Sequence, residues 1–268
     1  MKIGYLGPIG TYCYEACKNY IQDKPKAMIY DFKSISETMT ATLEDKIDEG
    51  VVPIENSTQG SVLETIDFLI DNSELYIIDE LSLKINHYLL SKCNNLKDLE
   101  KIYSHPQALA QCKNYIIKNF PNIELIETTS NSLAAKRAYE EEKSACIAGK
   151  SCSEIYDLNI LDKSINDEEN NETKFVVISK AENDETVHNK TSIIFSTKNE
   201  PGELYKVLGL FNIFNINLTK IESRPARTKL GEYNFLLDFI GTKNEAHIKV
   251  LLEQVKLKCS YFRILGSY

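Results

Sequence analysis

Two hydrophobic periods alternate along the first 180 residues of the chain. Short, nearly continuous apolar runs have the character of buried strands, as at 1–7, Met28–Phe32 and 50–54. Between them, apolar residues recur every three or four positions, as in 35–47, which is the spacing of a helix with one buried face. Strands that alternate with helices in this way predict an α/β fold with mostly parallel sheets.

The chain from residue 191 onward has a different pattern. The expected elements are a strand at 191–197, a helix after Pro201-Gly202, a strand ending at 222–225, a strand at 232–241, a helix at Ala246–Lys258 and a strand at 261–265. The order β-α-β-β-α-β predicts a small ferredoxin-like domain. The segment 181–190 is charged and shows neither period, so we interpret it as a linker.

Composition narrows the class of protein. The chain is 43% hydrophobic and 26% charged, and no apolar run approaches the ~20 residues of a membrane span. Its net charge of −8 argues against a nucleic-acid partner. The N-terminus lacks a signal-peptide pattern and the seven cysteines are scattered, so we expect reduced thiols in the cytoplasm. Four isolated histidines give no sign of a metal site.

Hydroxyl and amide side chains gather where expected strands pass into helices. Four such junctions are 10–11, 55–58, 104–107 and 128–132. Ligands of open α/β sheets bind at the carboxyl ends of strands, and helix N-termini favour anions. Helix capping alone explains any single junction, and Ser104 with Gln107 has the spacing of a capping box. Four junctions, together with 171–175, favour a site for an anionic ligand.

Familiar cofactor and nucleophile motifs are absent from the sequence. The glycines at 4, 7 and 10 do not have dinucleotide-binding spacing, and there is no phosphate-loop lysine and no Gly-x-Ser-x-Gly.

The junction motifs together resemble those of prephenate dehydratases. They are Gly7-Pro8-Ile9-Gly10-Thr11-Tyr12, Pro53-Ile54-Glu55-Asn56-Ser57, Ser104-His105-Pro106-Gln107-Ala108-Leu109 and Thr173-Lys174-Phe175, in the family's order. After the linker, Gly202-Glu203-Leu204-Tyr205 and Glu222-Ser223-Arg224-Pro225 resemble the phenylalanine-binding kind of ACT domain.

This resemblance implies a fold and a domain order. We expect a catalytic domain at 1–180 with two lobes arranged like a type II periplasmic binding protein, the linker at 181–190 and an ACT domain at 191–268. Lobe one would comprise about 1–77 plus 170–180, and lobe two about 78–169. Pairing of ACT domains would make the protein a homodimer or a dimer of dimers.

The implied activity is decarboxylating dehydration of prephenate to phenylpyruvate, without a cofactor or metal and under feedback control by L-phenylalanine. Thr173 would hydrogen-bond the departing hydroxyl group, and either Glu55 or His105 would be the proton source. Expected substrate-binding residues are Thr11, Asn56, Ser57, Ser104, Gln107, Ser130, Lys174 and Phe175. The expected phenylalanine site comprises Gly202, Glu203, Leu204, Tyr205, Leu208, Asn217, Leu218, Thr219, Glu222, Ser223, Arg224 and Pro225.

One residue departs from the pattern of the prephenate dehydratase family. Lys174 stands where the family has arginine, so it keeps the charge but loses the two-pronged geometry that suits a carboxylate.

The same motifs suit an arogenate dehydratase, and a non-catalytic amino acid sensor would reuse both modules. An aromatic amino acid hydroxylase would need an iron-binding cluster that this sequence lacks.

Overall fold

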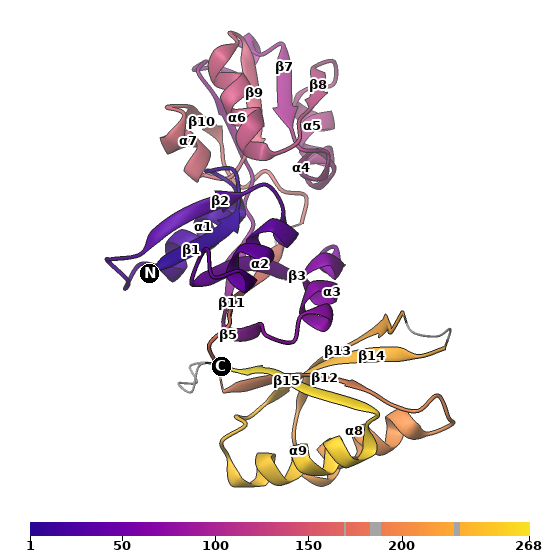
Figure 1. Ribbon diagram of the computed structural model, residues 1–268. Coiled ribbons are helices and arrows are strands. Elements are labelled where there is room, and N and C mark those ends of the chain that lie inside the picture. Colours follow the sequence, from indigo (N-terminus) through magenta and orange to yellow (C-terminus); the bar gives the residue numbers. More distant parts are fainter. Residues whose placement is uncertain (169, 183–188, 228–230) are drawn as a thin grey trace. The chain divides into compact units, whose positions relative to one another are not determined.

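The computed structural model describes residues 1–168, 170–182, 189–227 and 231–268, which form three sheets (Figure 1). By their internal contacts these residues divide into two compact units. Unit 1 comprises 1–38, 51–62 and 81–175, and unit 2 comprises 39–50, 63–80 and 176–268. Most of the expected linker, at 183–188, lies outside the described residues, so the predicted linker and lobe boundaries stay predictions.

The first sheet has the strand order β2-β1-β3-β11-β5, with the short strand β4 paired to β3. Its strands are β1 (Lys2–Leu6), β2 (Met28–Phe32), β3 (Glu49–Asn56), β4 (Gly60–Ser61), β5 (Tyr76–Lys84) and β11 (Glu172–Ser179). The helices that follow its strands are α1 (Tyr12–Tyr20), α2 (Ile35–Leu43) and α3 (Leu63–Asp71). Strands β3, β5 and β11 each run from one unit into the other.

The second sheet has the order β10-β6-β9-β7-β8. Its strands are β6 (Tyr88–Ser91), β7 (Lys101–Ser104), β8 (Glu124–Glu127), β9 (Ser144–Ala148) and β10 (Asn159–Asp162). Its helical segments are η1 (Leu96–Asp98), α4 (Pro106–Gln111), α5 (Lys113–Asn119), α6 (Asn131–Glu140) and α7 (Ser151–Ile155). Because β7 is parallel to β8 and β9 whereas β6 is antiparallel to β9 and β10, the sheet is mixed and not mostly parallel as predicted.

The third sheet is antiparallel, with the order β13-β14-β12-β15. Its elements are β12 (Lys190–Ser196), α8 (Glu203–Ile213), β13 (Leu218–Pro225), β14 (Tyr233–Ile240), α9 (Ala246–Lys258) and β15 (Tyr261–Ser267). Phe195 and Leu237 from the strands pack with Val207 and Leu251 from the two helices. The predicted α/β fold and the predicted βαββαβ order are both confirmed.

Residues with hydroxyl side chains cap two of the helices, whereas the predicted cap of α4 is wrong. Thr11 and Ser130 are side-chain N-caps of α1 and α6, and Gly202 precedes α8 with a φ of 82°, which glycine adopts without strain. At α4, however, the N-cap is His105, whose Nδ1 accepts from the backbone N–H of Gln107. Ser104 is instead the last residue of β7, where its hydroxyl lies 2.8 Å from the carbonyl oxygen of Ile147.

All seven cysteines lie in the described part of the chain and are free thiols. Among the described residues, no helix is long and apolar enough to cross a membrane.

Candidate active site

A cavity of about 130 Å³ in unit 1 collects residues from the junctions that the sequence singled out. It is lined by Tyr12, Cys13, Pro53, Asn56, Ile85, His87, His105, Gln107, Ala108, Gln111, Asn131, Asn171, Thr173 and Phe175. These side chains come from the start of α1, the end of β3, the segment between β5 and β6, helix α4, the start of α6, and the start of β11 with the residue before it. Three of the four junctions and the segment 171–175 therefore contribute side chains to one cavity, and Tyr12, which follows the junction 10–11, lines it too.

The side-chain amide of Asn56 is the centre of the hydrogen-bond network beside this cavity. Its Oδ1 accepts from the backbone N–H groups of Thr58 and Gln59, each over 3.1 Å. A backbone N–H can only donate, so these two bonds fix which end of the Asn56 amide is the oxygen. The Nδ2 group consequently faces β11, where it donates to Asn171 Oδ1 and Thr173 Oγ1 over 2.9 Å each.

Thr173 therefore has a defined hydrogen-bonding role. Because its Oγ1 accepts from Asn56, its own hydrogen is left to donate elsewhere, and the side chain lines the cavity. Phe175, two residues along the same strand, also lines the cavity and is buried. Thr173 thus presents an O–H donor beside an apolar ring, which suits an oxygen of a bound cyclic molecule.

A chain of hydrogen bonds continues from Asn56 to a buried histidine. The Thr58 hydroxyl donates to Asn56 Oδ1 over 2.6 Å, and the Gln111 amide donates to Thr58 Oγ1 over 3.4 Å. Gln111 Oε1 then lies 2.8 Å from His87 Nε2. Since Gln111 uses its N–H toward Thr58, its oxygen faces His87.

His87 is held neutral by its surroundings. Its side chain is 1% exposed, and its Nδ1 lies 3.0 Å from the Tyr12 hydroxyl. Burial lowers the pKa of His87 below its ordinary value, while the hydrogen bond to Gln111 opposes that shift. A lowered pKa favours the neutral imidazole near pH 7, and the ring is part of the hydrogen-bond network beside the cavity.

His105 and Gln107 open onto a second, wider depression. This depression, of about 640 Å³, is lined also by Thr11 and Ser130. Both of those hydroxyls cap helices, accepting from Tyr14 N and Leu133 N respectively. The structure thus places Thr11 and Ser130 beside His105 and Gln107, at the rim and not in the smaller cavity.

Glu55 and Lys174 lie elsewhere. Successive residues of a strand point to opposite faces, and Thr173 and Phe175 line the cavity, so Lys174 points away from it, and Glu55 is not among the lining residues. Their charged groups face each other, with Lys174 Nζ 3.9 Å from a Glu55 carboxylate oxygen. A direct role of either residue at a substrate stays a prediction.

Two further expected substrate residues hold the framework. The Ser57 hydroxyl donates to the carbonyl of Asn170 and accepts from the N–H of Glu172, each over 2.9 Å, which ties the turn after β3 to β11. Ser104 is fully buried, and its hydroxyl lies 3.2 Å from Asn131 Oδ1. Asn131 in turn lines the cavity, so Ser104 does not line the cavity itself and contacts a residue that does.

The residues expected to bind phenylalanine lie in unit 2, at the start of α8 and along β13. Gly202 precedes α8, the side chain of Glu203 pairs with Lys206, and Tyr205 is 78% exposed. Arg224 on β13 donates twice to the carboxylate of Asp67 on α3, over 2.8 Å each. Its guanidinium holds the pKa of Asp67 below the ordinary range.

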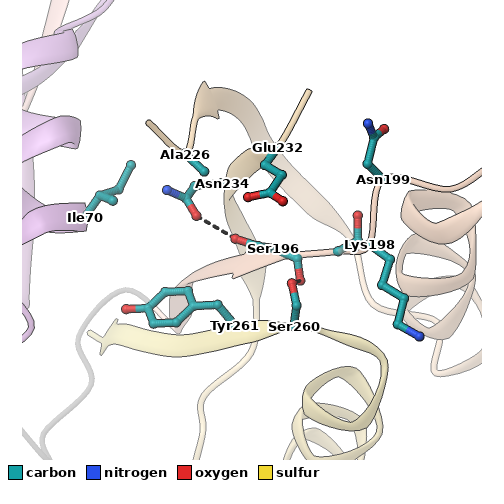
Figure 2. A pocket seen from close by; sticks show the side chains of 10 residues that line it. Ile70, Ser196, Lys198, Asn199, Ala226, Glu232, Asn234, Ser260 and Tyr261 are labelled. Carbon is teal, nitrogen blue, oxygen red and sulfur yellow. Dashed lines mark hydrogen bonds between the residues drawn. The ribbon is translucent and has the colours of Figure 1, made fainter. Parts of the chain in front are cut away.

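Unit 2 also contains a pocket of about 600 Å³, shown in Figure 2. It is lined by Ile70, Ser196, Thr197, Lys198, Asn199, Ala226, Glu232, Asn234, Ser260 and Tyr261. Ser196 donates to Asn234 Oδ1 within it (Figure 2). The expected phenylalanine-site residues are all described, and none lines this pocket.

Sequence reasoning missed Thr58, His87, Gln111 and Asn171 as site residues. Gln111 follows Gln107 by one helical turn on α4, and both line the cavity, so their spacing was the available signal. Asn171 lies in the segment 171–175 that the sequence singled out, whereas His87 gave no signal, because it acquires its partners from residues far away in sequence.

Two family models match the chain in succession. The model of the prephenate dehydratase family matches residues 3–183, and that of the ACT domain matches residues 191–256. A bifunctional chorismate mutase/prephenate dehydratase from Aquifex aeolicus is 37% identical over 268 residues, which is 100% of this chain and 73% of that protein. A prephenate dehydratase from Bacillus subtilis is 34% identical over 282 residues, covering 100% of this chain and 98% of that protein.

Solved structures share the fold over nearly the whole chain. The prephenate dehydratase of Arthrobacter aurescens in complex with L-Phe has a TM-score of 0.88 and 27% identity, covering 99% of this chain and 89% of that one. GqqA, described as a novel type of quorum quenching acylase, has a TM-score of 0.87 and 25% identity, covering 99% and 97%.

Proposed function

The chain belongs to the prephenate dehydratase family, and on that basis we propose that it converts prephenate to phenylpyruvate, CO2 and water under feedback control by L-phenylalanine. The catalytic part would comprise 1–180 and the regulatory part 191–268, which the extents of the two matching family models support. The free thiols support a reducing compartment, the cytoplasm.

The reaction needs few groups from the protein. The bond between the ring and its carboxylate breaks, the electron pair enters the ring, and the C–O bond on the opposite side breaks. The hydroxyl leaves with one proton as water, and aromatisation drives the step. The protein must bind the anionic substrate, keep the departing carboxylate poorly solvated and stabilise the leaving oxygen.

The orientation of Thr173 is the single observation that carries this proposal. Asn56 donates to Thr173 Oγ1, so the Thr173 hydroxyl donates its hydrogen to the leaving oxygen of the substrate. A threonine hydroxyl is too weak an acid to supply the proton by its own ionisation, so it positions the leaving group. Of the two predicted proton sources, His105 lines the cavity and Glu55 does not, which favours His105.

L-phenylalanine, the expected effector, would bind at the start of α8 and along β13. The bound L-Phe of the Arthrobacter aurescens relative supports this effector. The N-terminus of α8, with Gly202 before it, supplies backbone N–H groups for a carboxylate. Arg224, which shares β13 with Glu222 and Ser223, links this region to α3 through Asp67.

Assembly through the regulatory part follows from its exposed apolar side chains. Tyr205, Ile213 and Leu257, on α8 and α9, are each at least 75% exposed. Helices α8 and α9 are in contact with each other, and large exposed apolar side chains on both suit a surface that another chain covers. A second copy of this chain would give a homodimer, and light scattering on the purified protein tests it, since a monomer at micromolar concentration would contradict it.

The activity is tested by mixing the purified protein with prephenate and following phenylpyruvate, with and without L-phenylalanine. We expect turnover that phenylalanine suppresses. Parallel reactions with arogenate and with an acylated quorum-sensing signal separate this activity from an arogenate dehydratase and from the acylase activity in the description of GqqA. Absence of turnover of prephenate by folded protein overturns the proposal.

A further inference from the structure

Asn171 carries a buried hydrogen-bond donor that the network described above does not use. The residue is 1% exposed and lines the cavity between the loop before β11 and α4. Within the described residues, its Nδ2 atom is buried and has no acceptor. Buried amide groups are almost always paired in native proteins, and an unpaired one is destabilising, so a donor of this kind points to a ligand that is yet to bind.

The orientation of this amide follows from its neighbours. Asn56 presents its Nδ2 group, a donor only, toward Asn171. The Asn171 atom that faces this donor must therefore be its oxygen, Oδ1, which accepts the hydrogen bond. The distance of 2.9 Å between Asn56 Nδ2 and Asn171 Oδ1 is that of an ordinary hydrogen bond. A flipped Asn171 amide would set two N–H₂ groups against each other. The Nδ2 of Asn171 is therefore turned away from Asn56.

Asn56 orients both Asn171 and Thr173, and leaves each of them with hydrogens to donate. Asn171 Oδ1 and Thr173 Oγ1 both accept from the same Nδ2 group of Asn56, so the two side chains are neighbours. Among the residues that the structure describes, Asn171 Nδ2 has no acceptor, the Thr173 hydrogen is not used by Asn56, and both side chains line the same cavity. Two adjacent donors beside an apolar wall are suited to an oxygen atom that gains negative charge during a reaction.

We propose that Asn171 is a catalytic residue that donates, together with Thr173, to the leaving hydroxyl oxygen of the substrate. This inference rests on the proposed dehydratase activity. The amide supplies no proton: it stabilises the charge that accumulates on the oxygen as the C–O bond breaks, while the proton comes from a separate acid. The hydrogen bond strengthens as the charge grows, so it acts mainly on the transition state.

The test compares Asn171→Asp, Asn171→Ala and the wild-type protein in steady-state turnover of prephenate. Aspartate keeps the shape and the acceptor that Asn56 needs but has no donor, and alanine removes the group without adding charge. We expect kcat to fall by about 10²–10³-fold in both variants, as for loss of one donor to a developing charge, with KM changed by about threefold or less. Asn119→Asp, on the exposed surface of α5, is the control and should match the wild type.

The outcomes separate this inference from the proposed function. Wild-type protein that fails to turn over prephenate overturns both. An active wild type with folded Asn171→Ala retaining kcat within threefold overturns the inference alone, as does a loss confined to KM. Should Asn171→Asp fail to fold, its circular dichroism spectrum shows it, and the alanine variant decides.

Discussion

The amide of Asn56 donates to the hydroxyl oxygen of Thr173 over 2.9 Å, and two backbone N–H groups fix that amide in place. The contact leaves Thr173 as a donor toward the cavity. It explains how a hydroxyl group that does not ionise near neutral pH takes a defined role in an elimination reaction.

Replacing Asn56 with aspartate reverses this arrangement. A carboxylate at this position accepts the Thr173 hydrogen, so the hydroxyl no longer donates to the substrate. We expect kcat for prephenate to fall by at least about 100-fold, the loss typical of one donor at a developing charge. Retention of more than a tenth of wild-type kcat by folded Asn56→Asp would contradict the donor role of the Thr173 hydroxyl.

Replacing Lys174 with arginine, the residue of the family pattern, should change little. The side chain is partly exposed on the face of β11 opposite the cavity, where it pairs with Glu55. Because such pairs contribute about 0–1 kcal/mol, we expect kcat and KM of Lys174→Arg within about twofold of wild type. A tenfold gain in substrate affinity would place this residue at the substrate after all.

His87 makes the stability of the protein depend on pH. Burial lowers its pKa, so between pH 6.5 and the lower folded-state pKa the unfolded chain binds a proton that the folded chain does not. Its contribution is therefore complete above pH 6.5, and the unfolding free energy falls as the pH drops below that value, by up to about 1.4 kcal/mol per pH unit.

Urea denaturation at pH 7.5 and 5.5 measures this dependence. We expect His87→Gln to lose less stability between the two pH values than the wild type does. The exposed His247 provides the matched control, and His247→Gln should keep the wild-type slope. Equal slopes in all three proteins would show that His87 takes up its proton normally in the folded state.

The Arg224–Asp67 pair should carry part of the response to phenylalanine. It joins β13, which contains the expected effector residues, to α3, which begins shortly after the turn that holds Asn56. We expect Asp67→Asn to raise the half-inhibitory phenylalanine concentration by at least about fivefold, the lower end of typical coupling, while uninhibited kcat stays unchanged.

A double-mutant cycle with Arg224→Gln tests whether the pair acts as a unit. If it does, the double variant is no less sensitive to phenylalanine than either single variant. Lys143→Gln, which breaks an exposed pair with Glu100, should respond as the wild type does. If Asp67→Asn is inhibited by phenylalanine as strongly as the wild type, the pair between Arg224 and Asp67 has no part in the inhibition.

Local chemistry made much of the fold predictable. The strand Met28–Phe32 and the helix Ala246–Lys258 have the bounds that their hydrophobic periods predict. Short elements, such as the edge strand β10 and the helix α7, lack a full period and were missed. The sequence favours Ser104 as the N-cap of α4 because serine is the commoner cap, whereas the imidazole of His105 fills that role.

The sequence predicted which strand-to-helix junctions contribute to the site, but not which side chains face the cavity. The sequence placed Asn56, His105, Gln107 and Thr173 at strand ends, and the structure brings them to one cavity. It did not indicate which residues of β3 and β11 face that cavity, since the face depends on register between distant strands. That is why Glu55 and Lys174, which do not line the cavity, were expected beside the substrate.

Turnover of prephenate by Thr173→Val and Thr173→Ser tests whether the Thr173 hydroxyl acts on the leaving group. Valine keeps the shape of the side chain and removes the hydroxyl, whereas serine keeps the hydroxyl that Asn56 orients. We predict that the serine variant retains kcat within about tenfold, while the valine variant loses at least about 100-fold with the fold intact. A folded valine variant with near wild-type kcat would contradict the role proposed for Thr173.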